Sequence, residues 1–319
     1  MRANMERKLS VVIPSYNEEN SLHELYKKIL KNVNICMDAD LISEYELIFT
    51  DDGSTDASPL VMRDLCNRDS RVHMILLRKN FGKAVALNTA FRNVTGDIVI
   101  TMDADLQDDP AEIQRFICKL DEGFDFVSGW KVNRLDPLEK RIPSKLFNKV
   151  TSKLSGIELH DFNCGFKAYR KEVVDSLDIY GELHRYIPVL VDRNGYKIAE
   201  IQVHHQKRKF GKSKYGMERY LRGFFDFISV LFISKYYDKP MYFFGRIGIA
   251  SFGTGFIFCA ALTLKWMWGG VIGTRPLLLL GVMLILLGVQ FASIGLIGNM
   301  LVDLSYHSRY VENHVKEKR

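Results

Sequence analysis

Short runs of apolar, often β-branched residues recur along this chain, and each run is about as long as one buried strand. Helical patterns separate the runs: apolar residues at Leu22, Leu25 and Ile29 follow the first, and a helix is expected from Ala84 to Asn93. Strands that alternate with helices form a mostly parallel sheet with helices on both faces, so the predicted fold class is α/β. The expected strands are residues 9–13, 45–50, 72–77, 98–102, 124–128 and 198–203.

Acidic residues follow two of these strands at the point where each strand ends. Asp103 and Asp105 come directly after the run 98–102, and Asp51 and Asp52 follow the run 45–50. Sheets of this kind bind ligands outside the carboxyl ends of their strands. Carboxylates at that edge suit a hard divalent cation, Mg²⁺ or Mn²⁺, that also holds a phosphate. An isolated Asp-x-Asp is most often a solvated turn, but several polar loops that converge on one edge favour a binding site.

Composition limits the alternatives. The chain has 319 residues, of which 47% are hydrophobic, and a formal net charge of +6. This length allows one sizeable domain and an appendage. The five cysteines show no Cys-x-x-Cys spacing and no paired spacing with histidine, which favours reduced thiols in a cytoplasmic setting over disulfides or a zinc site. Residues 1–8 are polar and basic, and a strand-length run follows, so no signal peptide is expected.

Two long apolar runs occupy the last part of the chain. Residues 242–268 carry charge only near their ends, and residues 276–302 carry none. Each run exceeds the roughly 20 residues that cross a bilayer. A buried helix of a soluble core is the alternative, but two such runs in succession favour membrane helices. Cations are abundant before the runs and after His307 and scarce in the connector, so both termini are expected in the cytoplasm.

A basic segment, residues 207–214, precedes an amphipathic, aromatic-rich stretch, residues 215–237. This pattern is typical of a helix that lies in a membrane interface beside anionic head groups. A charge run is also common on an ordinary solvated surface. The membrane is therefore an expected partner, nucleic acid is not, and a homo-oligomer is left open.

Four motifs together resemble the family 2 glycosyltransferases, which have a nucleotide-diphospho-sugar binding domain. The resemblance covers the first two-thirds of the chain and implies a GT-A type, mostly parallel sheet. The motifs are Val12-Ile13-Pro14-x-Tyr16-Asn17-Glu18, Asp51-Asp52-Gly53-Ser54-x-Asp56, Asn80-x-Gly82-Lys83 and Asp103-Ala104-Asp105-Leu106-Gln107-Asp108.

The resemblance implies a role for each matching residue. Residues after the first strand would line the nucleotide pocket, and the pair Asp51 and Asp52 would hold the base or ribose. Metal coordination on the diphosphate, by Mg²⁺ or Mn²⁺, would fall to Asp103, Asp105 and Gln107. The residues implied to bind the nucleotide sugar are Pro14, Tyr16, Glu18, Asp51, Asp52, Lys83, Asp103, Lys212 and Ser213.

The acceptor is expected to meet a group of cations. A single lysine is best explained as solvated, but the clustering of these cations favours phosphate contacts, and they are Lys131, Arg134, Arg141 and Arg208. Lys131 stands where some members of the family have arginine, and a lysine there lacks the bidentate phosphate contact. Asp161 is a candidate for a general base or for a group that orients a cation, and both roles are left open.

The two apolar runs narrow the resemblance to the polyprenyl-phosphate glycosyltransferases, the group that includes dolichol-phosphate mannosyltransferases and bactoprenol glucosyltransferases. It implies transfer of a sugar from a nucleotide-diphospho-sugar, such as UDP-glucose, to a polyprenyl phosphate in one displacement with inversion. The lipid phosphate is already largely ionised at neutral pH, since its second pKa is about 6. The alternatives are a GDP-mannose donor, a different lipid or glycan acceptor, and a non-enzymatic membrane partner that kept the fold.

The resemblance and the patterns together predict four regions. They are a cytoplasmic GT-A catalytic domain (residues 1–214), an interfacial helix region (215–240), a two-helix transmembrane region (241–305) and a cytoplasmic tail (306–319). The expected location is the cell (inner) membrane, with the protein crossing it twice.

Overall fold

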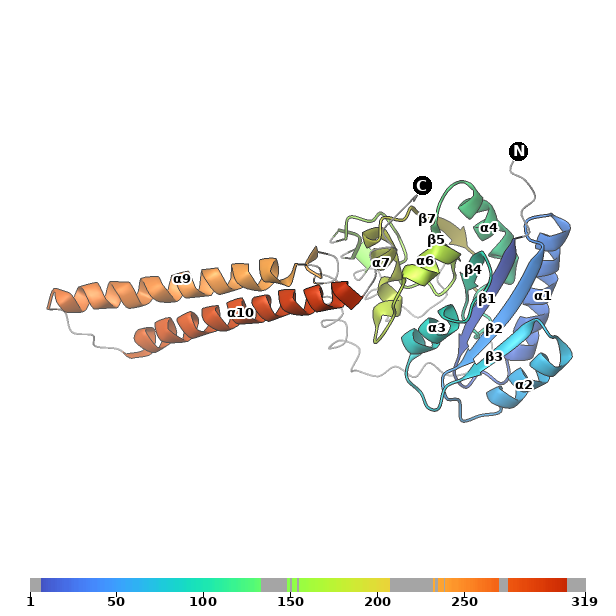
Figure 1. Ribbon diagram of the computed structural model, residues 1–319, viewed down its shortest axis with the longest axis horizontal. Helices are drawn as coiled ribbons and strands as arrows, with labels where there is room; N and C mark the ends of the chain where they lie inside the picture. The colour runs from blue at the N-terminus through green and yellow to red at the C-terminus, as the bar shows by residue number, and fades with distance from the viewer. Residues whose placement is uncertain are drawn as a thin grey trace. The chain divides into compact units, whose positions relative to one another are not determined.

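The computed structural model describes residues 7–132, 148–149, 151–153, 155–206, 232, 235–237, 239–269 and 275–308. The chain forms two compact units, Met1–Phe227 and Ile228–Arg319 (Figure 1). Most of the predicted interfacial region and the end of the predicted tail lie outside the described residues.

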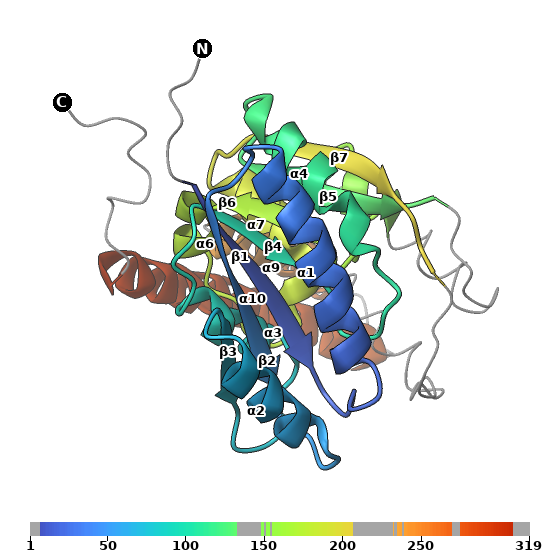
Figure 2. The ribbon, with the colours of Figure 1, turned by 90° about the vertical axis from the view of Figure 1, so that its right-hand side faces the viewer.

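The first unit is built on a sheet that has seven strands within the described residues, in the order β3-β2-β1-β4-β6-β5-β7 (Figure 2). The pairings among β1 to β4 and between β5 and β7 are parallel, and β6 is antiparallel to both of its neighbours. This confirms the predicted, mostly parallel α/β sheet. The strands are β1 (Lys8–Ser15), β2 (Glu44–Asp51), β3 (Val72–Leu76), β4 (Ile98–Thr101), β5 (Phe126–Lys131), β6 (Lys167–Arg170) and β7 (Ile198–Val203).

Helices pack on both faces of this sheet. Buried residues of α1 (Leu22–Asp38) and α4 (Ile113–Asp121) share one core with inward-facing residues of β1, β2 and β4. On the other face α3 (Lys83–Phe91) packs against β6, where the rings of Phe91 and Tyr169 lie 5.5 Å apart. The remaining helical elements of this unit are α2 (Ser58–Arg68), η1 (Pro110–Glu112), α6 (Lys171–Ser176), η2 (Leu183–Tyr186) and α7 (Ile187–Arg193).

Strand β6 is the element that the sequence patterns did not predict. It has four residues, and two of them, Lys167 and Arg170, are cationic. A strand this short with charged ends lacks the alternating or continuous apolar pattern by which strands are recognised. It forms because β4 and β5 pair with it on both sides, through registers such as Thr101 opposite Lys167.

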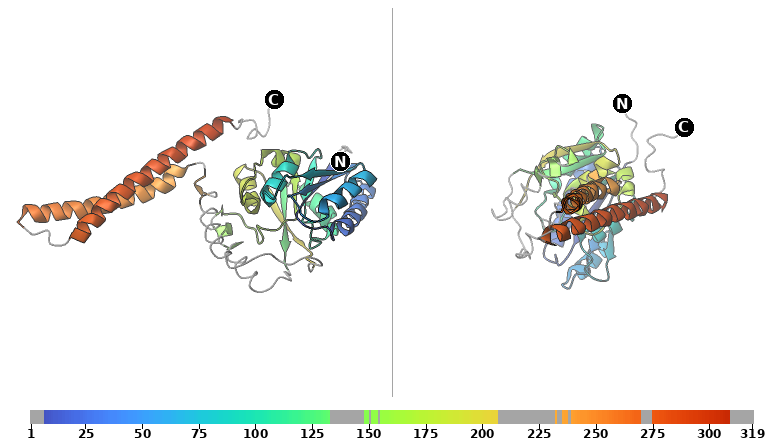
Figure 3. Two further views of the ribbon diagram at one scale, coloured as in Figure 1. Left: turned by 90° about the horizontal axis from the view of Figure 1, so that it is seen from below. Right: turned by 90° about the vertical axis from the view of Figure 1, so that its left-hand side faces the viewer.

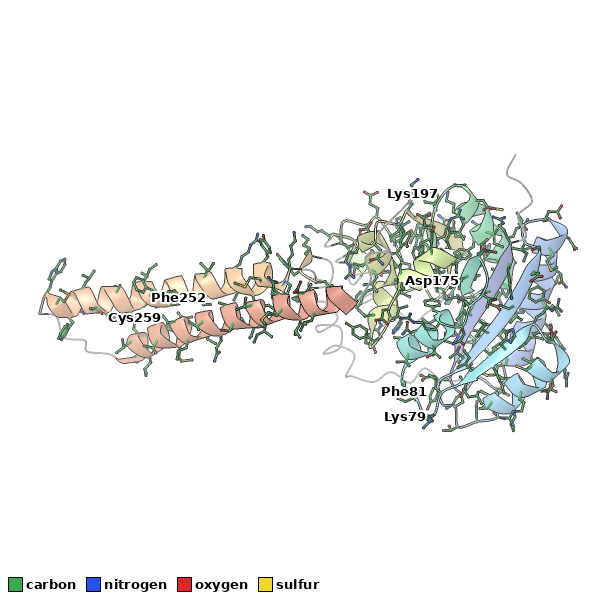
Figure 4. All side chains as sticks on the ribbon, viewed as in Figure 1. Lys79, Phe81, Asp175, Lys197, Phe252 and Cys259 are labelled. Atoms are coloured by element: carbon green, nitrogen blue, oxygen red, sulfur yellow. The ribbon has the colours of Figure 1, made fainter. Side chains whose placement is uncertain are left out.

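The second unit contains two long helices, α9 (Pro240–Met267) and α10 (Arg275–Ser308), which run side by side (Figure 3). Both are long and apolar enough to cross a membrane, with mean hydropathy of 1.9 and 2.5 in their spanning segments. In each helix only 11% of the most apolar segment is buried, whereas the core helix of a soluble domain is mostly buried. Phe252 of α9, labelled in Figure 4, lies beside Gly288 of α10 and still leaves 43% of its surface exposed.

Glycines form the contact between these two helices. A Cβ built on Gly255 would lie 2.5 Å from the carbonyl oxygen of Gly281, and one on Gly288 would lie 2.7 Å from that of Gly248. The backbones therefore touch along this line, which we call the glycine seam. Small residues that let backbones approach closely are typical of helix pairs in membranes.

Candidate functional site

The loop that follows β4 gathers three carboxylates at the carboxyl edge of the sheet. The backbone N–H of Asp103 donates to Asp108 Oδ2 at 3.2 Å, and that of Gln107 donates to Asp105 Oδ1 at 3.1 Å. Leu106 takes a left-handed conformation, with φ of 64°, which turns the loop back on itself. The predicted metal-binding residues Asp103, Asp105 and Gln107 are thus brought together, and we call residues 103–108 the metal loop.

The carboxylates of the metal loop have different electrostatic surroundings. Asp103 forms an ion pair with Lys83, at the start of α3. Burial alone would raise the pKa of Asp103, but the charges of Lys83 and Lys131 outweigh it and hold the pKa at about 2. Burial raises the pKa of Asp105 to about 6, and the nearby charges of Asp103 and Asp108 add to the effect. Asp105 forms no ion pair within the described part of the chain.

These residues fit a divalent cation. Two carboxylates and an amide side chain supply oxygen ligands, the type that Mg²⁺ and Mn²⁺ take. Asp105 is partly buried, has a raised pKa and forms no ion pair within the described residues, so a metal ion would stabilise its ionised form. No group of three or more His, Cys, Asp or Glu side chains that could enclose a metal occurs among the described residues, so phosphate oxygens or water would complete the coordination.

Lys131 lies against the metal loop. Its Nζ is 2.7 Å from Asp108 Oδ1, and the two side chains are 10% and 0% exposed. Burial opposes the charge of Lys131, but Asp108 outweighs this and raises the pKa of the lysine above its usual value. The cation predicted to meet the acceptor therefore also neutralises the third carboxylate of the loop.

The segment after β7 pairs with the same loop. His205 forms a backbone bridge with Asp108, and the N–H of Gln206 donates to the carbonyl of Gln107 at 2.9 Å. The side chains of Gln107 and His205 meet at 3.4 Å. This contact between His205 and the metal loop depends on how the end of β7 lies beside the loop, so the sequence alone does not predict it. The predicted site residues just beyond this segment, Arg208, Lys212 and Ser213, lie outside the described residues, as do Arg134 and Arg141.

The ends of β1 and β2 form a second part of the site. Pro14 pairs with Thr50 and Ser15 with Asp51, so Tyr16 and Glu18 follow at the same edge as the aspartate pair. Asp51 is 2% exposed; its Oδ2 accepts the N–H of Ser54 at 2.9 Å, and its Oδ1 has no hydrogen-bond partner within the described residues. A buried carboxylate oxygen without a donor is costly, which favours a ligand at this position.

Asp52 has a different role. It accepts the N–H of Phe81 at 2.8 Å and that of Gly82 at 2.9 Å. It therefore anchors the loop that carries Lys79 and Phe81, which lies beyond β3 and leads into α3 (Figure 4). Gly53 has a φ of 71°, and a Cβ there would lie 2.3 Å from the backbone of Lys79, so the two loops touch at a point where only glycine fits.

A small, partly open pocket adjoins the metal loop on the α3 side of the sheet. Its walls come from α3, the end of β4, the start of β6, η2 and the segment 163–165. We call it the α3 pocket. Its polar lining residues are Lys83, Thr101, Asn163, Lys167, Tyr169 and His184. Sequence reasoning missed Lys167 and His184, because only the pairing of β6 and the packing of η2 place them here.

Asp161 lies inside the turn that leads to this pocket. It is 1% exposed, and its Oδ1 accepts the N–H of Asn163 at 3.2 Å. Its own N–H donates to Glu200 at 3.0 Å. Asp161 therefore fixes the backbone on which the pocket residue Asn163 stands.

Comparison with known proteins gives the family. A model described as "Glycosyl transferase family 2" matches residues 10–178, more than half of the chain and the region of β1, β2 and the metal loop. The chain belongs to glycosyl transferase family 2. The match ends within the segment after α6, so the second unit lies outside it.

Two relatives extend the likeness over nearly the whole of this glycosyltransferase. The dodecaprenyl-phosphate galacturonate synthase of Rhizobium johnstonii is 34% identical over 316 residues, which cover 96% of this chain and 91% of the relative. The undecaprenyl-phosphate 4-deoxy-4-formamido-L-arabinose transferase of Shewanella sediminis is 36% identical over 299 residues, with coverage of 92% and 86%. The curated relatives are thus polyprenyl-phosphate sugar transferases.

Solved structures share the fold. The glucosyl-3-phosphoglycerate synthase from Mycobacterium tuberculosis, in complex with Mn²⁺ and UDP-glucose, matches with a TM-score of 0.53 and 22% identity over 71% of this chain and 78% of that one. The same enzyme with phosphoglyceric acid also gives a TM-score of 0.53, with 21% identity. At this identity the likeness establishes the GT-A fold of the first unit.

Proposed function

We propose that this glycosyltransferase moves a sugar from a nucleotide-diphospho-sugar to a polyprenyl phosphate at a membrane surface, with inversion at the anomeric carbon. The observation that carries the proposal is the metal loop: a strand end that presents Asp103 and Asp105 in a chain that also has two exposed apolar helices. Two relatives that are polyprenyl-phosphate sugar transferases match this chain over most of their length. Their likeness supports a polyprenyl phosphate as the acceptor.

The proposed donor site uses the edge formed by β1, β2 and β4. Asp51 offers an unpartnered buried oxygen to the base or ribose, next to Pro14, Tyr16 and Glu18. Asp103, Asp105 and Gln107 would hold Mg²⁺ or Mn²⁺, which when bound offsets the charge on the departing nucleoside diphosphate. Lys83 pairs with Asp103 and Lys131 pairs with Asp108, so two of the three carboxylates in the metal loop have a counter-charge. A UDP-sugar is proposed, and a GDP-sugar is the alternative.

The proposed acceptor phosphate attacks as its own nucleophile. It is largely ionised at neutral pH, so it needs orientation more than deprotonation. The burial of Asp161 and its hydrogen bond to the N–H of Asn163 favour an orienting role for this carboxylate over that of a general base. Arg134, Arg141 and Arg208 remain proposed phosphate contacts on the strength of the sequence.

The transfer itself tests the proposal. The full chain in detergent, with Mn²⁺ and undecaprenyl phosphate, is incubated with a panel of UDP- and GDP-sugars. We expect a lipid-linked sugar phosphate whose anomeric configuration, measured by NMR, is opposite to that of the donor. Asp105→Ala should abolish the product and leave the thermal unfolding temperature close to that of the wild type. Transfer at the normal rate in EDTA, or hydrolysis of the donor without a lipid product, would contradict the proposal.

The proposed topology follows the predicted regions: a cytoplasmic catalytic domain over 1–214, an interfacial region over 215–240, a membrane hairpin over 241–305 and a cytoplasmic tail over 306–319. Protease added to sealed inside-out vesicles should cut both the domain and an epitope placed after Arg319. Protection of the epitope while the domain is cut would show an odd number of crossings and overturn the hairpin. Right-side-out vesicles, in which both regions should be protected, serve as the control.

A further inference from the structure

The α3 pocket contains a buried lysine whose charge is only partly offset by Asp161 and Asp103, which lie near it without forming an ion pair with it. Lys167 is 2% exposed, and its Nζ donates to the carbonyl of Cys164. It forms no ion pair with a carboxylate among the described residues. Burial, with the charge of Lys83, lowers the pKa of Lys167 and outweighs the opposing effects of Cys164, Asp161 and Asp103. An unpaired buried charge is costly, so an anion from outside the protein would stabilise this arrangement.

The other polar groups of the pocket do not supply that negative charge. Asp103 is engaged by Lys83, which also lines the pocket. Burial, with the charge of Lys83, lowers the pKa of His184 to about 3, so this imidazole is neutral at physiological pH. Its Nδ1 is buried and has no hydrogen-bond partner within the described residues. Among the described residues, the pocket thus holds one lysine without an ion-pair partner and one imidazole nitrogen without a hydrogen-bond partner.

The position of the pocket says which anion can reach it. Gly165 and Lys83 line the pocket, and both contact the carboxylate of Asp103. A nucleotide sugar whose diphosphate is held at the metal loop would therefore place its sugar, the next group along the molecule, near the α3 pocket. Asn163, which is exposed, also lines the α3 pocket.

We propose that the α3 pocket receives a carboxylate carried by the donor sugar, so that the donor is a nucleotide-linked uronic acid whose carboxylate pairs with Lys167 and hydrogen-bonds with His184. This inference rests on the proposed function and specifies its sugar. The names of the two relatives point to different sugars, galacturonate and 4-deoxy-4-formamido-L-arabinose, and only the first is an acid. The buried Lys167 in the pocket of this chain favours an acidic sugar over a neutral one.

Matched donors that differ only at C6 test the inference. The wild-type protein is assayed with undecaprenyl phosphate and the pairs UDP-galacturonate and UDP-galactose, UDP-glucuronate and UDP-glucose, and GDP-mannuronate and GDP-mannose. A charge-assisted hydrogen bond in a buried site corresponds to about 10- to 100-fold in affinity. We expect kcat/KM for the acid of the preferred pair to exceed that of its neutral partner by about this factor.

A substitution assigns the preference to Lys167. Lys167→Met, which keeps the length of the side chain, should reduce the ratio of kcat/KM between acid and neutral donor by about tenfold or more. Lys167→Arg should restore most of that ratio. Lys171→Met removes the next lysine along the chain, which pairs with Asp175 on α6, and should leave the ratio at its wild-type value. If Lys167→Met does not fold, the wild-type ratio and Lys167→Arg still decide the question.

The outcomes separate this inference from the proposed function. Transfer of neutral sugars at rates equal to or above those of the acids overturns the uronic-acid pocket and leaves the transferase intact. An equal loss with both donors in Lys167→Met, accompanied by a higher KM for undecaprenyl phosphate, would show that the pocket takes the acceptor's phosphate and would also overturn it. Absence of transfer from every donor in the panel overturns the proposed function, and the inference with it.

Discussion

The Cα of Gly165 lies directly against the carboxylate of Asp103: a Cβ built on this glycine would come within 2.6 Å of Asp103 Oδ2. Thr101 fixes the approach, because its Oγ1 donates to the carbonyl of Gly165 at 2.9 Å. The segment that leads into β6 and the start of the metal loop therefore share one closely packed contact. Any side chain at position 165 must displace the carboxylate.

Gly165→Ala should lower kcat/KM by about 100-fold, the scale of a misplacement of about 1 Å in a reacting group. The affinity for Mn²⁺ should fall as well, because Asp103 moves. Steady-state transfer and Mn²⁺ titration measure the two effects. Gly253→Ala, at a position on α9 with open space around the new methyl group, is the control and should behave like the wild type. Unchanged kinetics in Gly165→Ala would show that Asp103 does not need its observed position.

Metal affinity should depend on pH through Asp105. The pKa of this carboxylate is raised to about 6, and a ligand must lose its proton to bind a metal. The apparent dissociation constant for Mn²⁺ should therefore rise about tenfold between pH 7 and pH 5. In the metal-free protein, a lower pH has the opposite, stabilising effect on folding. The carboxylate of Asp105 binds a proton at a higher pH in the folded state than in the unfolded chain, so its contribution to the free energy of unfolding rises as pH falls from about 6 towards 4.

Calorimetric titration of Mn²⁺ at several pH values, with unfolding curves of the metal-free protein, measures both effects. Asp105→Asn should bind Mn²⁺ weakly, with a flat pH dependence between pH 5 and pH 7. A wild-type affinity that stays constant over this range would contradict the raised pKa of Asp105.

Asp161→Asn should keep transfer within about tenfold of the wild type. The asparagine retains an oxygen that can accept the N–H of Asn163, which is the contact seen at 3.2 Å. General-base catalysis contributes about 10²- to 10⁴-fold, so loss of a base would be much larger. Saturation kinetics against undecaprenyl phosphate separate the roles: added acceptor should recover part of the loss if Asp161 orients, and none if it is an obligatory base.

The glycine seam should tolerate no large side chain. Gly255→Leu puts a branched side chain where a Cβ already lies 2.5 Å from the backbone of α10, and it should destabilise the helix pair by about 1–3 kcal/mol. Gly253→Leu, two residues away on the open side of the same helix, is the matched control. Thermal loss of helical circular dichroism in detergent should shift to lower temperature in the first variant alone. Equal shifts of the unfolding temperature in both variants would show that Gly255 does not lie at the contact between α9 and α10.

Features that depend only on residues close together in the sequence could be predicted from it. Asp103 and Asp105 follow directly after a β-branched run, so a strand end with two carboxylates was predictable, and β4 confirms it. The apolar content of α9 and α10 likewise needs no tertiary information. The GT-A architecture followed from the four motifs and is confirmed by solved relatives.

The pairings that shape the site could not be predicted in this way. Lys131 was expected in a cluster of cations that contact a phosphate, but its contact with Asp108 depends on how β5 lies beside the metal loop. Lys167 belongs to a four-residue strand whose charged ends resemble a solvated turn. Burial of such a lysine is a property of the packed sheet, because the chain positions that surround it are far apart in sequence.

The contacts proposed for the nucleotide and those proposed for the sugar come from partly different elements, with Lys83 of α3 common to both. Contacts proposed for the nucleotide come from β1, β2 and their loops, whereas the α3 pocket takes its cation from β6 and its imidazole from η2. If the proposed pocket holds the sugar, substitutions at positions 167 and 184 would change the preferred sugar while most residues proposed to hold the nucleotide stay the same. A duplicated gene with this sheet could acquire a new sugar through a few changes on β6 and η2, while the membrane hairpin and the donor nucleotide stay the same.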